Sequence, residues 1–190
     1  VVCADQSDNP GGGAPSDSTF VLRWMLDHKI KNVGLAIFYD PEVVKLAIAA
    51  GEGAMLSVRL GGKTSPASGD PVDLRVKVVK IIKDYMHIFP QAEGEPMYAA
   101  CEDTVALEHD GIFIIVSSRR TQCFSPAAFS DFGITDLDIY VPKSINHFMS
   151  GFGPIAGDVF YMATPGAIVP IMTMIPYETY KSDGVWPWAE

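Results

Sequence analysis

The sequence has 190 residues, of which 48% are hydrophobic and 19% charged, which is enough for one globular domain with a full core. Its formal net charge of −9 at pH 7 disfavours a nucleic-acid partner, because binding phosphates requires a basic surface. No apolar run approaches the roughly 20 residues of a membrane-spanning helix. Three widely spaced cysteines without a CxxC pair disfavour a disulfide framework and fit reduced thiols in the cytoplasm.

The chain begins without a methionine, inside an apolar stretch at 1–4 that we expect to form a strand. We therefore interpret the sequence as a fragment of a longer protein. Next comes DNPGGGAPSDST at 8–19, where three consecutive glycines lie between two prolines. Residues 19–28 predict a helix that is apolar almost all round, with Asp17 or Ser18 as its N-cap.

The following segments alternate between strand and helix patterns. Residues 32–39 form a continuous apolar run, which is typical of a strand covered on both faces. Asp40-Pro41-Glu42 supplies an N-cap, a first-turn proline and an acid for a helix that Gly51 ends. This alternation predicts an α/β layer arrangement.

The middle of the chain instead has antiparallel patterns. Residues 54–60 predict a strand, and 72–78 alternate apolar and charged residues, with a phase change at Val78-Val79 that indicates a bulge or the strand's end. Two apolar runs around Asp110-Gly111, at 104–108 and 112–116, predict a hairpin. We therefore expect one α/β domain with a mixed sheet, parallel plus antiparallel, flanked by helices.

Shorter elements fill the last third. The patterns predict a short helix from 125 to 133, a strand at 138–141, a helix at 143–152 and a strand at 159–163. We expect the tail, 176–190, to pack against the surface as irregular structure.

The glycine-rich loop is the first candidate site. Glycines let backbone N–H groups approach a ligand, and a helix start favours an anion. The spacing matches neither GxGxxG nor GxxxxGK[ST], so nucleotide-binding fingerprints do not apply. A tight turn before a capped helix is the alternative. We favour ligand binding, because the polar residues Asp8, Asn9 and Asp17 beside Gly11, Gly12 and Gly13 exceed what a cap requires.

Two further candidates follow predicted strands. Arg119 and Arg120 come just after the strand at 112–116, where ligands of α/β sheets collect, and paired arginines can clamp a carboxylate. That at least one of them is a solvated surface charge stays equally open. Ser144 and His147 are three apart on the predicted helix and share a face, so His147 is a candidate acid, base or ligand orienter. A histidine on a polar helix face is more often a surface residue.

Known catalytic signatures are absent from the sequence. It contains no HxH, no HExxH and no carboxylate–histidine cluster at ligand spacing, so we expect no metal site within this chain. It also lacks GxSxG, so a nucleophilic serine triad has no support. The residue patterns alone therefore do not indicate which reaction, if any, the protein catalyses.

Five separated motifs nevertheless resemble one family. In chain order they are DNPGGGAPSDST at 8–19, GGKTSPASGDP at 61–71, SSRRTQCFSP at 117–126, VPKSINHF at 141–148 and GPIAGDVFYMATPGA at 153–167. Together they resemble the C-terminal domain of the microcystinase C (MlrC) family, a group assigned as zinc metallopeptidases. The resemblance implies the C-terminal, substrate-binding half of a zinc-dependent hydrolase that cleaves peptide or other amide bonds.

That resemblance also implies a division of labour. The zinc ligands of the family lie in a preceding N-terminal domain, so residues 1–190 would bind no zinc alone and would be inactive without their own N-terminal domain as partner. The substrate would be a small peptide or amide, and neither a nucleic acid nor a membrane would be a partner. Whether the protein forms a homo-oligomer stays open. Microcystin degradation belongs to the best-known members, and the resemblance does not extend it to this protein.

Residues that match the family's motif positions form the predicted site. The resemblance implies assisting catalytic roles in proton transfer for Asp8 and His147. It implies substrate binding by Asn9, Gly11, Gly12, Gly13, Asp17, Arg119, Arg120, Thr121, Lys143 and Ser144. The alternative is a non-catalytic module in which the Gly11–Gly13 loop holds a small anionic ligand.

Overall fold

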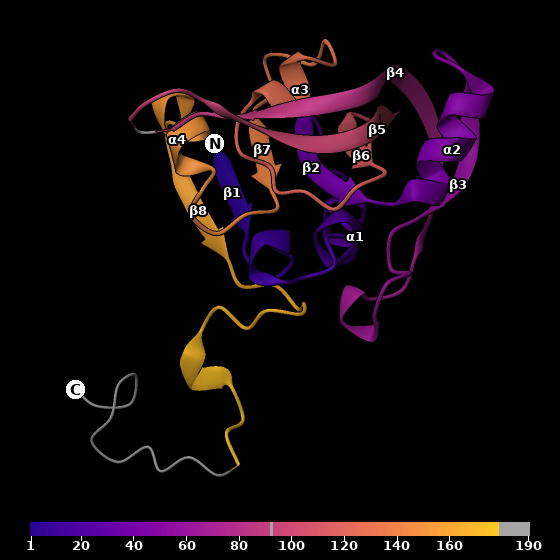
Figure 1. Ribbon diagram of the computed structural model, residues 1–190. Helices are drawn as coiled ribbons and strands as arrows, with labels where there is room; N and C mark the ends of the chain where they lie inside the picture. The colour runs from indigo at the N-terminus through magenta and orange to yellow at the C-terminus, as the bar shows by residue number, and fades with distance from the viewer. Residues whose placement is uncertain (92, 179–190) are drawn as a thin grey trace.

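The structure is a computed structural model that describes residues 1–91 and 93–178. Its centre is one sheet of eight strands in the order β3-β4-β5-β6-β2-β7-β1-β8 (Figure 1). The strands are β1 (Val2–Asp5), β2 (Val33–Tyr39), β3 (Met55–Leu60), β4 (Val72–Phe89), β5 (Met97–His109), β6 (Ile112–Ser117), β7 (Ile139–Pro142) and β8 (Val159–Met162). Neighbours from β6 to β8 pair in parallel, whereas β3, β4 and β5 extend the sheet in antiparallel fashion. The predicted mixed sheet of an α/β fold is confirmed.

Helices cover both faces of this sheet. They are α1 (Phe20–Asp27), α2 (Pro41–Ala50), α3 (Ala127–Ser130) and α4 (Met149–Phe152), with short 3-10 turns at Pro10–Gly12, Pro66–Ser68, Gly153–Ile155 and Met172–Met174. Leu22 of α1 and Val44 of α2 pack in one buried cluster with Leu35 of β2. Phe129 of α3 and Phe152 pack in a second cluster on the other side. Burial on both faces explains why β2 reads as an uninterrupted apolar run.

The start of α2 follows from its sequence. The Asp40 carboxylate accepts a hydrogen bond from the Val43 amide at 3.3 Å, and Pro41 occupies the first helical turn. Gly51 ends the helix with φ 86°, a backbone conformation that residues with a side chain rarely adopt. An N-cap such as Asp40 stabilises a helix by about 1 kcal/mol. The helix predicted here is confirmed.

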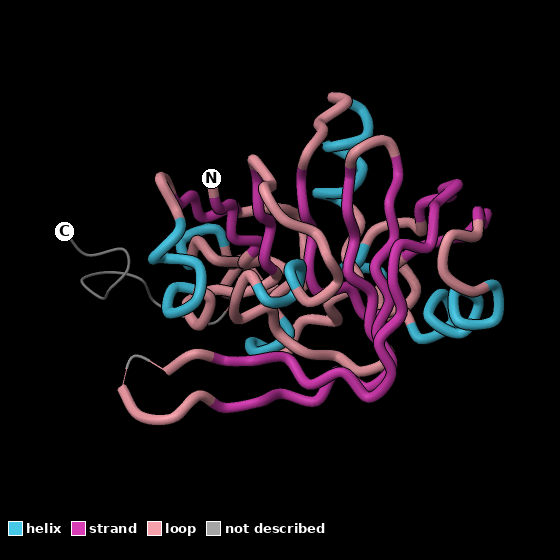
Figure 2. The backbone as a smooth tube through the Cα atoms, turned by 90° about the horizontal axis from the view of Figure 1, so that it is seen from above, coloured by secondary structure: helices cyan, strands magenta, loops and turns pink. Residues whose placement is uncertain are grey.

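The longest hairpin joins β4 to β5. Pairing shifts register between Val78 and Lys80, so the phase change at Val78-Val79 marks a bulge and not the end of the strand. The strand continues to Phe89, and Figure 2 shows the distal half of the hairpin as a two-stranded ribbon apart from the other strands. Its alternation is interrupted by further register shifts, which explains why sequence patterns did not predict it.

One prediction for the last third is wrong. Only Met149–Phe152 of the helix expected at 143–152 is helical, because Lys143 and Ser144 are buried beneath neighbouring loops and hold the chain in turns after β7. Of the tail expected at 176–190 to pack against the surface, only 176–178 are described, in the segment that Figure 1 shows leaving the body. Residues 179–190 of that tail lie outside the described residues. No helix in the described ranges is long and apolar enough to cross a membrane.

Candidate functional site

The predicted site residues gather at one edge of the sheet. The strands β6, β2, β7, β1 and β8 run parallel, so their carboxyl ends lie at a common edge, where the crevices of α/β sheets bind ligands. The connections that leave this edge comprise residues 6–19 after β1, Asp40 after β2, 118–125 after β6, 143–148 after β7 and 163–168 after β8.

A buried ion cluster lies beneath these loops. The Lys143 ammonium contacts the carboxylates of Asp8 at 2.7 Å and Asp5 at 3.2 Å, and all three side chains are at most 1% exposed. It also donates to the Ser18 carbonyl at 3.3 Å and lies 4.4 Å from the Phe38 ring centroid. Burial alone would lower the pKa of Lys143, but the two carboxylates outweigh it and raise that pKa. Lys143 is therefore a buried cation that joins β7 to β1.

Asp8 is committed to the same cluster. Its Oδ1 accepts from the Ser16 amide at 2.8 Å, and its Oδ2 accepts from the Ser18 amide at 2.8 Å as well as from Lys143. The carboxylate thereby shapes the loop from within. The structure brings the predicted site residues Asp8 and Lys143 together and places both below the surface.

The glycines form a tight 3-10 turn. The Gly11 amide donates to Asn9 Oδ1 at 3.0 Å, the Gly12 amide to the Asn9 carbonyl at 3.1 Å, and the Gly13 amide to the Pro10 carbonyl at 3.1 Å. Only Gly13, with φ 99°, adopts a left-handed conformation. Because all three N–H groups already have acceptors, the anion-cradle interpretation is not favoured.

Close approach of other loops explains why Gly11 and Gly12 lack side chains. A Cβ at Gly11 would overlap the side-chain amide of Gln122, and one at Gly12 would lie 2.6 Å from Cδ1 of Ile168. The glycine loop is therefore a docking surface for the connections after β6 and β8. Gln122 was not among the predicted site residues, although it lies in the motif SSRRTQCFSP at 117–126.

Gln122 joins three of the predicted residues in one hydrogen-bond network. Its Nε2 lies 2.7 Å from Asn9 Oδ1 and 3.4 Å from Ser144 Oγ. Its Oε1 lies 3.1 Å from Nδ1 of His147. Asn9 and Ser144 are buried, whereas His147 is exposed. Ser144 and His147 are thus linked through Gln122 and not by a shared helix face.

Aromatic rings flank His147 at the surface. Its ring centroid lies 5.3 Å from that of Phe89, at the end of β4, and 6.2 Å from that of Phe124. These contacts and the Gln122 hydrogen bond hold the imidazole from two sides. His147 is consequently an exposed titratable group in a defined orientation.

Asp17 anchors a second loop instead of capping α1. Its Oδ2 accepts from the amides of Lys63 and Thr64, each at 2.8 Å, and its Oδ1 accepts from the Ser68 hydroxyl. The N-cap position belongs to Thr19, which makes no side-chain capping bond, so the cap predicted for Asp17 or Ser18 is wrong. The buried Ser18 hydroxyl has no hydrogen-bond partner among the residues that the structure describes.

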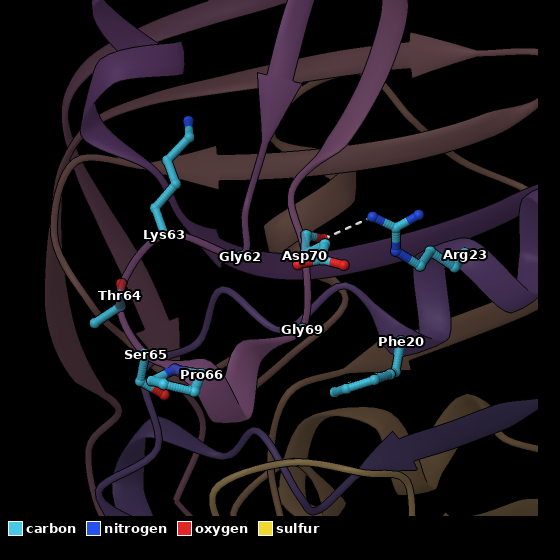
Figure 3. A pocket seen from close by; sticks show the side chains of 9 residues that line it. All are labelled: Phe20, Arg23, Gly62, Lys63, Thr64, Ser65, Pro66, Gly69 and Asp70. Carbon is cyan, nitrogen blue, oxygen red and sulfur yellow. Dashed lines mark hydrogen bonds between the residues drawn. The ribbon is translucent and has the colours of Figure 1, made fainter.

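The loop anchored by Asp17 lines a hollow of about 830 Å³ (Figure 3). Arg23 on its wall donates to the carbonyls of Asp70 at 2.8 Å and Pro71 at 2.7 Å. Lys63 is paired with Asp40 at 2.7 Å. Both cations of this hollow are therefore engaged in holding the loop. The lining residues are Phe20, Arg23, Gly62, Lys63, Thr64, Ser65, Pro66, Gly69 and Asp70.

The two predicted arginines border a second hollow, of about 370 Å³. Arg119 approaches Glu102 at 3.6 Å, with both side chains exposed, and Arg120 is also exposed. Thr121 donates its hydroxyl to the Ala100 carbonyl at 2.9 Å, which ties this loop to β5. Pro15 of the glycine loop and Thr64 complete the lining with Tyr39 and Ser118. The arginines thus lie beside the glycine loop, in a hollow whose described lining does not include His147.

A zinc ion does not fit the residues that the structure describes. Within residues 1–91 and 93–178, no group of three or more histidine, cysteine, aspartate or glutamate side chains is placed to hold a metal. The buried carboxylates of Asp5 and Asp8 are both paired with the Lys143 ammonium.

The sequence matches one protein family over nearly its whole length. Residues 3–179 match the family described as MlrC C-terminus. The chain belongs to this family, as its five motifs suggested.

Individual relatives agree with this assignment. The chain is 33% identical over 190 residues to Microcystinase C from Sphingomonas sp, a match that covers 99% of this chain and 36% of that protein. The crystal structure of a protein named "Putative metallopeptidase" from Mesorhizobium sp. BNC1 has the same fold, with a TM-score of 0.81 and 24% identity, over 95% of this chain and 37% of that one. The chain therefore spans about a third of the length of these relatives.

Proposed function

We propose that this chain is the substrate-binding part of a zinc-dependent hydrolase that cleaves peptide or other amide bonds. The observation that carries this proposal is the match to the MlrC C-terminus family together with the 33% identity to Microcystinase C. Because the described residues do not fit zinc, we assign the metal to a preceding N-terminal domain, which is the chain's partner, in a cytoplasmic enzyme.

The geometry supports separate roles for the exposed and the buried residues. His147, Arg119 and Arg120 are exposed beside the glycine loop at the carboxyl edge of the parallel strands, where a substrate can reach them. We assign substrate contacts to the arginines, whose planar guanidinium groups suit the carboxylate of a peptide terminus. We assign assistance in proton transfer to His147.

Asp8 and Lys143 receive a positioning role instead. Their side chains are fully buried and bonded to each other and to the loop backbone, so they fix the position of the glycine loop without touching substrate. Asp17 and Thr121 act in the same way on the neighbouring loops. The alternative of an anion-binding module gains no support, because the amides of the glycine turn are already bonded.

Replacement of His147 in the full-length protein tests this proposal. His147→Ala should lower kcat for hydrolysis of small peptides by about 10²-fold or more, the usual contribution of a proton-transferring side chain. His28→Ala is the matched control, because His28 is an exposed histidine directly after α1, stacked on Trp24. If His147→Ala leaves both kcat and KM at the level of the control, His147 has no part in the reaction.

A further inference from the structure

The orientation of the Gln122 amide is determined by its neighbours. The backbone amide of Gly11 can only donate, so Asn9 Oδ1, at 3.0 Å from it, must be an acceptor. The group of Gln122 that lies 2.7 Å from the same oxygen must then be its NH2 donor. Its carbonyl oxygen consequently faces His147. An unambiguous backbone donor thus settles an amide orientation that side-chain shape alone leaves open.

The same logic assigns the proton on His147. The Gln122 carbonyl oxygen can only accept, so His147 Nδ1, at 3.1 Å, must carry a hydrogen. In a neutral imidazole only one ring nitrogen is protonated, which leaves Nε2 with a free lone pair. The exposed side of the ring therefore presents an acceptor.

We infer that Gln122 is a positioning residue that fixes His147 in the Nδ1–H tautomer, so that Nε2 accepts a hydrogen bond or a proton from an N–H or O–H group of the substrate. The inference rests on the proposed function for its substrate, but the tautomer itself follows from this chain alone. It also defines a specificity: peptide groups that present a donor to Nε2 are favoured over groups that present only an acceptor.

Gly11 contributes to the hydrogen-bond network that orients His147. Only a residue without a side chain leaves room for the Gln122 amide, and the same residue supplies the N–H that sets the amide's orientation. The buried hydroxyl of Ser144, at 3.4 Å, lies on the NH2 side of Gln122 as a second acceptor. The proton position on His147 is thus determined by the glycine loop, two hydrogen bonds away.

Nitrogen NMR of the histidine rings in the 190-residue chain, at a pH where they are neutral, tests the assignment. We expect His147 as Nδ1–H in the unaltered chain and mainly as Nε2–H in Gln122→Met, which keeps the length of the side chain but removes its acceptor. His28 and His109 are internal references, because their Nδ1 atoms lie 2.8 and 2.9 Å from the carbonyls of Trp24 and Arg75. An Nε2–H His147 in the unaltered chain, or no change in Gln122→Met, overturns the inference.

Gly11→Ala provides a second route to the same result. The added methyl group displaces Gln122 without altering its chemistry, so the His147 tautomer should shift as it does in Gln122→Met. Gly157→Ala is the matched control, because a Cβ there meets no atom within 4 Å. Gln91→Met is the control for the glutamine substitution, since the Gln91 amide donates to the Phe89 carbonyl, outside the network. A tautomer change in either control would overturn the specific role of Gln122.

Kinetics of the full-length enzyme separate this inference from the proposed function. Gln122→Met should lower kcat by about tenfold or more, because its His147 then presents a donor where an acceptor is required. If the tautomer shifts as expected but neither Gln122→Met nor His147→Ala lowers kcat, the proton-transfer role proposed for His147 fails and the positioning inference stands. If His147→Ala lowers kcat but Gln122→Met leaves tautomer and kcat unchanged, the inference fails and the function stands.

Discussion

Lys143 forms buried ion pairs with the carboxylates of Asp5 and Asp8, and removing one partner leaves the remaining charges buried without a counter-charge. Lys143→Met should destabilise the chain by about 3–5 kcal/mol, because Asp5 and Asp8 would remain buried without their cation. Urea unfolding measures this difference. Lys45→Met removes an exposed ion pair with Glu42 and should change stability by less than about 0.5 kcal/mol. A loss below about 1 kcal/mol for Lys143→Met would contradict the buried-cation interpretation.

His87 is the buried histidine of the chain and makes stability depend on pH. Its Nε2 accepts from the amides of Phe124 and Ser125 at 3.0 and 3.4 Å, and burial lowers its pKa from 6.5 to about 4. The pKa of His87 is lower in the folded chain than in the unfolded chain. Between pH 6.5 and about pH 4 the unfolded chain therefore binds a proton on this histidine that the folded chain does not. The stability it contributes is therefore present above pH 6.5 and is lost as the pH falls towards 4.

Comparing two pH values tests this effect of His87. Between pH 7.5 and pH 5 the chain should lose about 2 kcal/mol of unfolding free energy through this group. In His87→Gln the side chain does not titrate, whereas all other groups are unchanged. The loss of unfolding free energy between pH 7.5 and pH 5 should therefore be about 2 kcal/mol smaller than in the unaltered chain. Equal losses in both proteins, measured by urea unfolding, would show that His87 titrates normally in the folded state.

Residue types predicted the site only in part. His147 stood out because histidine can titrate near neutral pH, and the arginines because they follow a strand. Gln122 carries no charge, and although it lies in the motif at 117–126, its link to Asn9, 113 residues away, could not be predicted from spacing. Asp8 and Lys143 were both predicted as site residues, and only the fold shows that they form an ion pair below the surface.

At the scale of elements, Asp17 connects the start of α1 to the loop after β3. In Asp17→Ala the amides of Lys63 and Thr64 lose their acceptor, so their hydrogen exchange should accelerate by about tenfold or more, as expected for a lost charge-assisted hydrogen bond. Asp73→Ala is the control, because Asp73 is an exposed partner of Arg59 in β3. Unchanged exchange at Lys63 and Thr64 would show that Asp17 does not hold this loop.

Elements with strong local signals were predictable, and those determined by distant contacts were not. β2 and α2 matched their patterns, because one is buried on both faces and the other has a complete set of capping residues. The helix expected at 143–152 shortened to α4, because burial of Lys143 fixes the preceding turn. The distal half of the β4–β5 hairpin was not predicted, because register shifts break its alternation.

At the scale of the whole molecule, the chain supplies loops and a positioned histidine but no fitting set of metal ligands in the part that the structure describes. The mixed sheet was predictable from its local patterns, whereas the proposed hydrolase function rests on resemblance and family membership. No arrangement of these side chains alone specifies an amide-cleaving reaction. We therefore propose that catalysis requires a metal-bearing N-terminal domain joined to this one.

Peptide hydrolysis by the full-length protein and by the 190-residue chain, each before and after chelation and again after zinc is restored, tests this claim most directly. We predict hydrolysis by the full-length protein that is lost on chelation and regained with zinc, and none by the chain alone under any of these conditions. Hydrolysis by the isolated chain at a rate comparable to that of the full-length protein would contradict the account. So would full-length activity that chelation leaves unchanged.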